Sequence, residues 1–289
     1  MELMRVLYRS SIFIIFALNV IPSVASTSNR QASVAAKPSY IISENVDRFF
    51  TLLELAEEGD ATAQHDVGVY FLTDEHSVEK DYKQAFKWLK KAAEQNHSEA
   101  QYKLAIMYSE GLGVEVDSKE ALGWYLKSAN QGYAKSQFNL GSMYRHGKGV
   151  EQDLDEALKW YIKAANQNDA KAQHNLGLMY ENGVGIPIDN QVAMKWYQKS
   201  AKQNYALAQH NIGLMYAKGL GVKQDYIKAL YWLNLSANQG NSESKRNIAL
   251  IYEKGYGVPV NLTKALGLYQ ESCIEGVFVA CIKYQELNR

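Results

Sequence analysis

The feature that constrains this chain most is an internal repeat with a period of 36 residues. The same step separates Tyr108 from Tyr144, and it also separates Gln101, Gln137, Gln173 and Gln209. It relates all five tryptophans of the chain, which are Trp88, Trp124, Trp160, Trp196 and Trp232. A fixed period over most of a chain is typical of architectures in which each unit packs on its neighbours. The sequence therefore predicts a stacked array of units.

Each unit is predicted to be a pair of helices. In residues 170–182, for example, apolar and small residues follow the helical spacing of one buried face. A Gly-x-Gly loop ends the first helix in all full units except the first, which has the longer segment 73–78 instead. We expect units at 60–96, 97–132, 133–168, 169–204, 205–240 and 241–276, a half unit at 277–289 and a lone helix near 46–58.

The second helix of each unit has recognisable ends. It begins after an N-cap residue, namely Asp81, Asp117, Asp153, Asp189, Asp225 or Asn261. It ends where asparagine and glycine alternate, at Asn96, Gly132, Asn168, Asn204, Gly240 and Gly276. These two residue types tolerate left-handed backbone best, so the alternation predicts a left-handed C-cap.

A small residue recurs in the middle of the first helices, at Gly68, Ala105, Gly141, Gly177, Gly213 and Ala249. Glycine inside a helix costs about 1 kcal/mol, so we expect it to permit close approach of the second helix. The expected partners are the alanines at a second-helix position, Ala93, Ala129, Ala165, Ala201 and Ala237.

The first 25 residues have the three-part plan of a secretory signal peptide. Arg5 and Arg9 precede the apolar stretch 12–18, and small residues follow around Ala25 and Ser26. That stretch is far shorter than the roughly 20 residues of a membrane-spanning helix. We expect cleavage near Ala25 or Ser26, a flexible linker over 26–45, and an exported chain without stable membrane insertion.

Charge and cysteine content exclude several classes of function. The chain has 31 Lys and Arg against 31 Asp and Glu, which excludes a strongly basic nucleic-acid binder. Two cysteines exclude a disulfide-dense scaffold and a zinc site of four thiolates. We expect no nucleic-acid partner.

The motifs L-G-x-M-Y, G-x-G-V and D-x-x-x-A-x-x-W-Y together resemble Sel1-like repeats, relatives of the tetratricopeptide repeat. The resemblance covers residues 46–289. It implies an all-α fold, a right-handed α/α superhelical solenoid of about six helix-turn-helix repeats. It also implies a bacterial periplasmic or secreted protein whose candidate partners are cell-envelope enzymes or a host factor.

The resemblance to tetratricopeptide packing implies a concave groove lined by the variable positions of the first helices. One row is His65, Tyr102, Phe138, His174, His210 and Arg246, and a second is Val69, Ile106, Ser142, Leu178, Leu214 and Leu250. Arg145 lies at their edge. Aromatic, arginine and apolar residues in rows are typical of protein and peptide recognition. The alternative is that single members only complete helix packing.

Catalytic and ligand-binding alternatives have weaker support. Repeated Gly-x-Gly loops between helices indicate turns and not phosphate cradles. The histidines of equivalent positions stand about 10 Å apart in packed helices, whereas a metal binds nitrogen at about 2 Å. We therefore expect no metal and no cofactor.

An enzyme remains the second interpretation. Ser77–Lys80 and Ser242–Lys245 match the Ser-x-x-Lys motif of penicillin-recognising enzymes, without its companion motifs. The resemblance to cysteine-containing Sel1-like proteins implies weak β-lactam binding or hydrolysis, or a peptidoglycan-related activity. A third interpretation, a eukaryotic secreted adaptor, would use Asn96, Asn234 or Asn261 as glycan acceptors. The leading interpretation is a non-catalytic adaptor.

Cys273 and Cys281 are candidates for a disulfide. Cys273 takes the alanine position of the last full unit, and Cys281 takes the recurring glutamine position of the next helix. They lie across an interhelical turn at positions predicted to touch, which suits a bridge. The spacing also resembles bridges of cysteine-rich secreted Sel1-like proteins. Two free buried thiols are the alternative.

Overall fold

A computed structural model describes residues 39–73 and 79–288 of the chain. Residues 43–289 form one compact unit. The predicted signal peptide, 1–25, and most of the predicted linker lie outside the described residues. Within the described ranges all regular structure is helical and no strand occurs. The helices are α2 (Ser39–Glu57), α3 (Ala61–Tyr70), α4 (Tyr82–Glu94), α5 (Ser98–Glu110), α6 (Ser118–Asn130), α7 (Ala134–His146), α8 (Leu154–Asn166), α9 (Ala170–Asn182), α10 (Asn190–Ala201), α11 (Ala206–Lys218), α12 (Tyr226–Ala237), α13 (Ser242–Lys254), α14 (Leu262–Ile274) and α15 (Phe278–Leu287).

Helix α2 precedes the repeats, where a lone helix is predicted. It begins at Ser39, inside the segment that the sequence favours as a linker. The Phe49 ring lies 5.4 Å from that of Tyr70 and 5.8 Å from that of Phe71. Phe49 is buried, so α2 covers the apolar side of the first helix hairpin.

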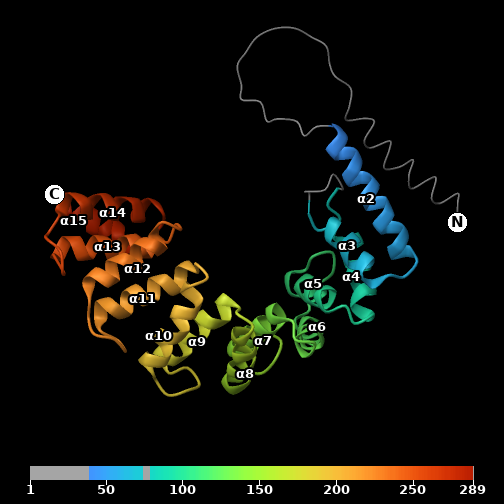
Figure 1. Ribbon diagram of the computed structural model, residues 1–289, viewed down its shortest axis with the longest axis horizontal. Coiled ribbons are helices and arrows are strands. Elements are labelled where there is room, and N and C mark those ends of the chain that lie inside the picture. Colours follow the sequence, from blue (N-terminus) through green and yellow to red (C-terminus); the bar gives the residue numbers. More distant parts are fainter. Residues whose placement is uncertain (1–38, 74–78, 289) are drawn as a thin grey trace, which may run out of the picture. The chain divides into compact units, whose positions relative to one another are not determined.

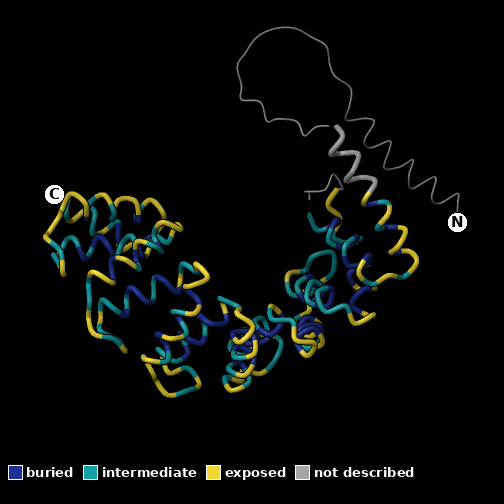
Figure 2. Tube along the Cα trace, viewed as in Figure 1, coloured by how far each residue is buried: buried dark blue, intermediate teal, exposed yellow. Residues whose placement is uncertain are grey.

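The helices from α3 onward pack mainly on the helices next to them in sequence (Figure 1). Their contacts are most extensive within the hairpins α3–α4, α5–α6, α7–α8, α9–α10, α11–α12 and α13–α14. Buried apolar residues form successive clusters along this series, and buried and exposed stretches alternate along the helices (Figure 2). The predicted all-α repeat solenoid is confirmed.

The helix ends follow the predicted residues. Each predicted N-cap side chain accepts a backbone N–H of the first turn, as Asp117 does from Lys119 and Glu120. At the other end of the second helices, Asn96, Asn168 and Asn204 have positive φ angles of 64°, 64° and 61°. Gly132, Gly240 and Gly276 are left-handed at the same position. The predicted left-handed caps are therefore confirmed.

The small residue of the first helix has a different partner from the predicted one. A β carbon on Gly141 would lie 2.7 Å from the ring of Tyr161, and the ring of Tyr197 fills the same space beside Gly177. Leu89 and Leu233 take this place in two other units. The expected alanine partner is therefore wrong, because a large second-helix side chain lies against the glycine and needs the room that a missing β carbon leaves.

Buried glutamines link α3, α5, α7 and α9 to the helix before each of them, whereas Gln209 bonds Asn204 and position 245 is a lysine. The side-chain amide donates to the carbonyl of an alanine eight residues earlier, in the preceding second helix, as in Gln101 to Ala93 (3.0 Å) and Gln137 to Ala129 (3.1 Å). The same amide accepts a bond from a glutamine after the second helix of its own unit, as from Gln131 to Gln101 (2.7 Å). Both sides of a buried amide are satisfied, so its burial carries little penalty.

Candidate partner-binding surface

Members of the first predicted row lie against the neighbouring unit. Three of them pack on the N-cap residue of the next first helix. The ring centroids are 4.7 Å apart for His65 and His97, 5.2 Å for Tyr102 and Tyr133, and 5.4 Å for His174 and Tyr205. His65 and His174 are only 8% and 7% exposed, so they offer little surface to a partner. Tyr102 is half-buried.

The other three members of this row are half-buried and also have contacts inside the solenoid. The ring of Phe138 lies 5.9 Å from that of Tyr161. His210 Nδ1 is 2.7 Å from the hydroxyl of Ser244, and Arg246 pairs with Glu243 at 2.7 Å. Four members of the row therefore contact the next unit, whereas the contacts of Phe138 and Arg246 lie within their own unit. The role of the row in partner binding stays a prediction.

Burial keeps two histidines of this row neutral. It lowers the pKa of His174 from 6.5 to about 4, and it lowers the pKa of His210 to about 4 as well. Asn211 Nδ2 lies 3.2 Å from His174 Nε2. The amide nitrogen is a donor, and the imidazole nitrogen can accept its hydrogen bond only when the ring is neutral. These rings act as packed neutral groups at physiological pH.

The second predicted row has the same intermediate exposure as Tyr102 and Phe138, and two of its members, Ile106 and Leu178, pack against buried clusters. We call Val69, Ile106, Ser142, Leu178, Leu214 and Leu250 the first-helix strip. Every member has intermediate exposure, and Ser142 is its polar member. The six side chains come from one position of six first helices, α3, α5, α7, α9, α11 and α13. The strip thus presents apolar surface at regular intervals.

A row of tyrosine hydroxyls, not foreseen from the sequence, lies between consecutive first helices. Tyr197 donates to Glu181 (2.6 Å) and Tyr269 donates to Glu253 (2.8 Å). Burial raises the pKa of Tyr125 to about 12. The signal was present in the sequence: the acceptor position holds Ala217 in the unit whose tyrosine is replaced by Leu233.

In the third unit this row has an unsatisfied member. Tyr161 is fully buried, and its hydroxyl has no hydrogen-bond partner in the described residues. The side chains of Arg145, Asn175 and Ser142 lie around it. Arg145, predicted at the edge of the groove, is half-buried at this point.

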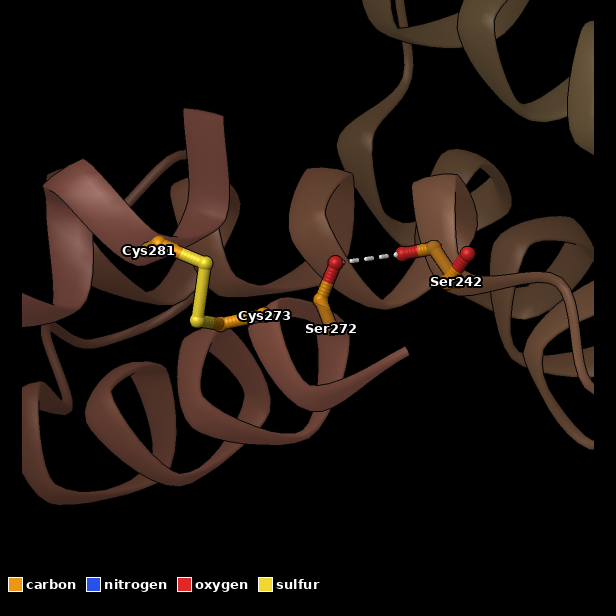
Figure 3. Close-up of a disulfide and its surroundings, with 4 residues drawn as sticks. All are labelled: Ser242, Ser272, Cys273 and Cys281. Carbon is orange, nitrogen blue, oxygen red and sulfur yellow. Dashed lines mark hydrogen bonds between the residues drawn. A yellow bond between two sulfur atoms is a disulfide. The ribbon is translucent and has the colours of Figure 1, made fainter. Parts of the chain in front are cut away.

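The two cysteines form the predicted disulfide, which ties α15 to α14 (Figure 3). Their Cα atoms are 4.6 Å apart. Cys281 and Cys273 occupy the positions of the glutamine and the alanine that are hydrogen-bonded in earlier hairpins, so a covalent bond replaces that hydrogen bond. Next to Cys273, the Ser272 hydroxyl donates to the Ser242 carbonyl at 2.8 Å and joins α14 to α13.

The surroundings of Lys245 do not suit an enzyme of the Ser-x-x-Lys type. Its ammonium group pairs with Glu275 and with Glu271, the latter at 3.1 Å. The hydrogen bond to Glu275 raises the pKa of Lys245. A lysine that activates a serine must be unprotonated, so Ser242 has no activating base here. Ser77 of the other motif lies outside the described residues.

The described residues contain no group of three or more His, Cys, Asp or Glu side chains placed to hold a metal ion. None of the described helices has both the length and the apolar character needed to cross a membrane. A disulfide suggests an oxidising compartment.

The fold and its surface define a class: repeat solenoids built from helix hairpins, which generally serve as scaffolds for protein interaction. The model of the Sel1 repeat family matches residues 61–97, 98–133, 134–169, 170–205, 206–241 and 242–277. The chain therefore belongs to the Sel1 repeat family.

Solved structures agree with this assignment. A protective antigen present in uropathogenic Escherichia coli strains, which displays an SLR fold, is 31% identical with a TM-score of 0.69. That match covers 83% of this chain and 59% of the antigen, so the chain spans only part of that protein's length. A Sel1 repeat protein from Oxalobacter formigenes is 28% identical with a TM-score of 0.69, over 81% of this chain and 97% of that one. No protein with a curated description matches the chain.

Proposed function

We propose that this chain is an exported, non-catalytic adaptor that binds a protein or peptide along the first helices of its solenoid. The observation that carries the proposal is the first-helix strip. Apolar side chains left half-exposed at one position of consecutive helices provide the apolar centre that interfaces require. The neighbouring aromatic row, with Tyr102 and Phe138 half-buried, widens this surface.

The test is a peptide selection with a matched pair of variants. The chain itself shows that serine is tolerated in the strip, because Ser142 occupies it in α7. We expect the wild-type solenoid to enrich binders from a displayed library of random dodecapeptides. We expect the double substitution Ile106→Ser and Leu178→Ser to lower the affinity for those peptides at least tenfold. The melting temperature should fall only slightly. Binding is measured by fluorescence anisotropy and stability by thermal melting.

The control variant is Ile227→Ser, which removes the same kind of side chain from an exposed position in α12 away from the strip. It should bind the selected peptides as the wild type does. Equal weakening by the control and the strip variant would contradict the proposal, as would a selection that enriches no peptide.

Two observations support export as part of the proposal. The disulfide needs an oxidising compartment to persist, and residues 1–25 have a signal-peptide plan. Expression in Escherichia coli of the full chain and of residues 26–289 tests this part. The full chain should reach the periplasm, start near residue 26 by intact mass and contain oxidised cysteines. An uncleaved full chain that stays in the cytoplasm with free thiols would contradict export.

A further inference from the structure

The starting observation is an apolar strip on the outward side of α12. The repeat position of Tyr231 holds lysine in three earlier second helices, as Lys87, Lys159 and Lys195. The repeat position of Leu235 holds lysine in four of them, as Lys91, Lys127, Lys163 and Lys199. In α12 both positions have lost the charge, and Ile227 lies one turn before them. We call Ile227, Tyr231 and Leu235 the outer strip.

The outer strip is open to solvent. Ile227 and Tyr231 are 58% and 60% exposed, and Leu235 has intermediate exposure. The three residues are spaced by four, so they share one side of the helix. Leu233, which α12 buries completely, lies on the opposite side. An exposed apolar strip where the other second helices carry lysine indicates a contact with another molecule.

One flank of the outer strip is basic. Trp232 of α12 packs against the buried cluster of α10 and α11, so α10 is the second helix on this side. Lys195 and Lys199 of α10 are both exposed. Lys199 lies over the Trp196 ring at 4.0 Å. Neither lysine pairs with a carboxylate of the described residues, so this flank has two uncompensated positive charges.

The other flank of the outer strip is acidic. Leu268 of α14 packs against the buried cluster of α12 and α13, so α14 is the second helix on this side. Glu271 and Glu275 share a single ammonium group, that of Lys245. Two carboxylates against one ammonium group leave one negative charge uncompensated. The side chain of Glu271 is 58% exposed, so this charge is accessible to a second molecule.

We propose that two copies of this chain associate through their outer strips, around a two-fold axis parallel to α12. Such an axis keeps every residue at its height along the helix and exchanges the flanks, so α10 of one copy faces α14 of the other. Lys199 and Glu271 occupy the same repeat position and therefore meet across the interface. Lys195 faces Gly267, beside which nothing lies within 4 Å of an added β carbon.

The charges favour a second copy of the chain over a different occupant. An acidic partner would leave the α14 flank unpaired, and a basic partner would leave the α10 flank unpaired, whereas a second copy pairs both. The charges also select the axis. A two-fold axis across the helices would place α10 on α10, and Lys195 and Lys199 would then face their own copies. Like charges in contact oppose association.

The experiment measures the mass of the purified chain by sedimentation velocity over a series of concentrations. We expect a dimer. Tyr231→Lys installs the residue that Lys195 provides one unit earlier, so it should fold and should raise the dissociation constant at least tenfold, or about 1.4 kcal/mol. The control is Leu55→Lys, which replaces a 44% exposed leucine of α2 and should dimerise as the wild type does.

The dimer surface and the proposed peptide surface are separable. Ile227→Ser should weaken the dimer and still bind the selected peptides, because it lies outside the first-helix strip. A wild-type chain that stays monomeric would overturn the dimer and leave the proposed function standing. A dimer that Tyr231→Lys leaves intact, or that Leu55→Lys weakens equally, would also overturn it.

Charge reversal tests the orientation of the two copies. Lys199→Glu and Glu271→Lys should each weaken self-association, because each places like charges at both contacts of the symmetric dimer. Mixed in equal amounts, the two variants should form a heterodimer in which both contacts join opposite charges. Thermal melting establishes that each variant is folded. A mixture of folded variants that stays monomeric would overturn the arrangement.

Discussion

At the scale of single residues, Tyr197 and Tyr161 occupy equivalent repeat positions, so comparing them measures how much one hydrogen-bond acceptor contributes to folding stability. Tyr197→Phe removes the hydroxyl that donates to Glu181, so we expect the free energy of unfolding to fall by about 1–2 kcal/mol. Tyr161→Phe removes a buried hydroxyl without a partner and should raise it by about 1–3 kcal/mol. Urea denaturation of the two variants gives both values. Equal losses would show that the two hydroxyls have equivalent surroundings.

The buried histidines predict a dependence of stability on pH. The pKa of His174 is about 4 in the folded chain against 6.5 as its ordinary value, so the unfolded chain takes up a proton that the folded chain does not. The stabilising effect is complete above pH 6.5 and is lost as the pH falls from 6.5 toward 4, with a slope of up to about 1.4 kcal/mol per pH unit. Unfolding free energies measured across this range show the loss.

The chain offers a substitution that isolates this effect. Phe138 occupies the position of His174 one unit earlier, so His174→Phe should fold and should have a shallower slope between pH 6.5 and 4. A slope unchanged by His174→Phe would mean that this ring is not the titrating group.

Residue-level prediction from the sequence succeeded where the cause is local. The left-handed backbone at Asn96, Asn168 and Asn204 follows from which residues tolerate that conformation. The partner of Gly141 could not be derived in this way, because a small residue indicates close approach without indicating which distant side chain approaches. The position of Arg145 beside Tyr161 is also nonlocal, since the two residues come from different helices.

At the scale of helices, the last one depends on the disulfide. In α15 only Ala280 is buried, and Phe278 is 74% exposed, so packing alone holds this helix weakly. We expect trypsin to cut after Lys283 faster in Cys281→Ala, and in reduced wild type, than in the oxidised chain. Mass spectrometry follows the fragments. Cleavage after Lys254, at the end of α13, should keep its rate, and an unchanged rate at Lys283 would contradict this role of the bridge.

The helices themselves were predictable because their signals repeat. The N-cap and C-cap residues recur with the period, so the helix boundaries predicted in one unit are supported by the same residues in the next. The start of the helix that precedes the repeats was harder to predict. Helix α2 lies before the periodic region and starts at Ser39, where no repeated signal marks it. The bridge between Cys273 and Cys281 was predictable because repeat positions already indicated which residues meet.

At the scale of the whole molecule, the repeats behave as exchangeable units. Deleting residues 170–205 joins Asp169 to Ala206, which restores the Asp-Ala junction that precedes Ala170 and also Ala61. Because each hairpin packs mainly on its neighbours, we expect the shortened chain to fold with the same helical content per residue and a lower melting temperature. Far-ultraviolet circular dichroism and thermal melting measure both. A loss of helicity per residue would show that distant units depend on one another.

The fold of the whole molecule could be predicted from the 36-residue period of the sequence. The binding surface could not be predicted from the positions that vary between units. The residue type varies between units in both first-helix rows. The side chains of His65 and His174, however, are covered by the neighbouring unit, so their residue type matches that unit. Sequence alone cannot separate variation that matches a partner from variation that matches an adjacent repeat. Burial makes that distinction only for His65 and His174, since Leu178 and Leu214 share the intermediate exposure of the other members of the first row.

The regular glutamine links between hairpins have a consequence for any ligand that lies along the helices. They repeat the same contact between a first helix and the second helix before it, so successive first helices follow at a regular step, which we take as on the order of 10 Å. An extended polypeptide advances about 3.3 Å per residue. A bound chain running across the helices would therefore meet one anchoring position at every third residue. The anchoring residues of ligand sequences should accordingly recur at every third position.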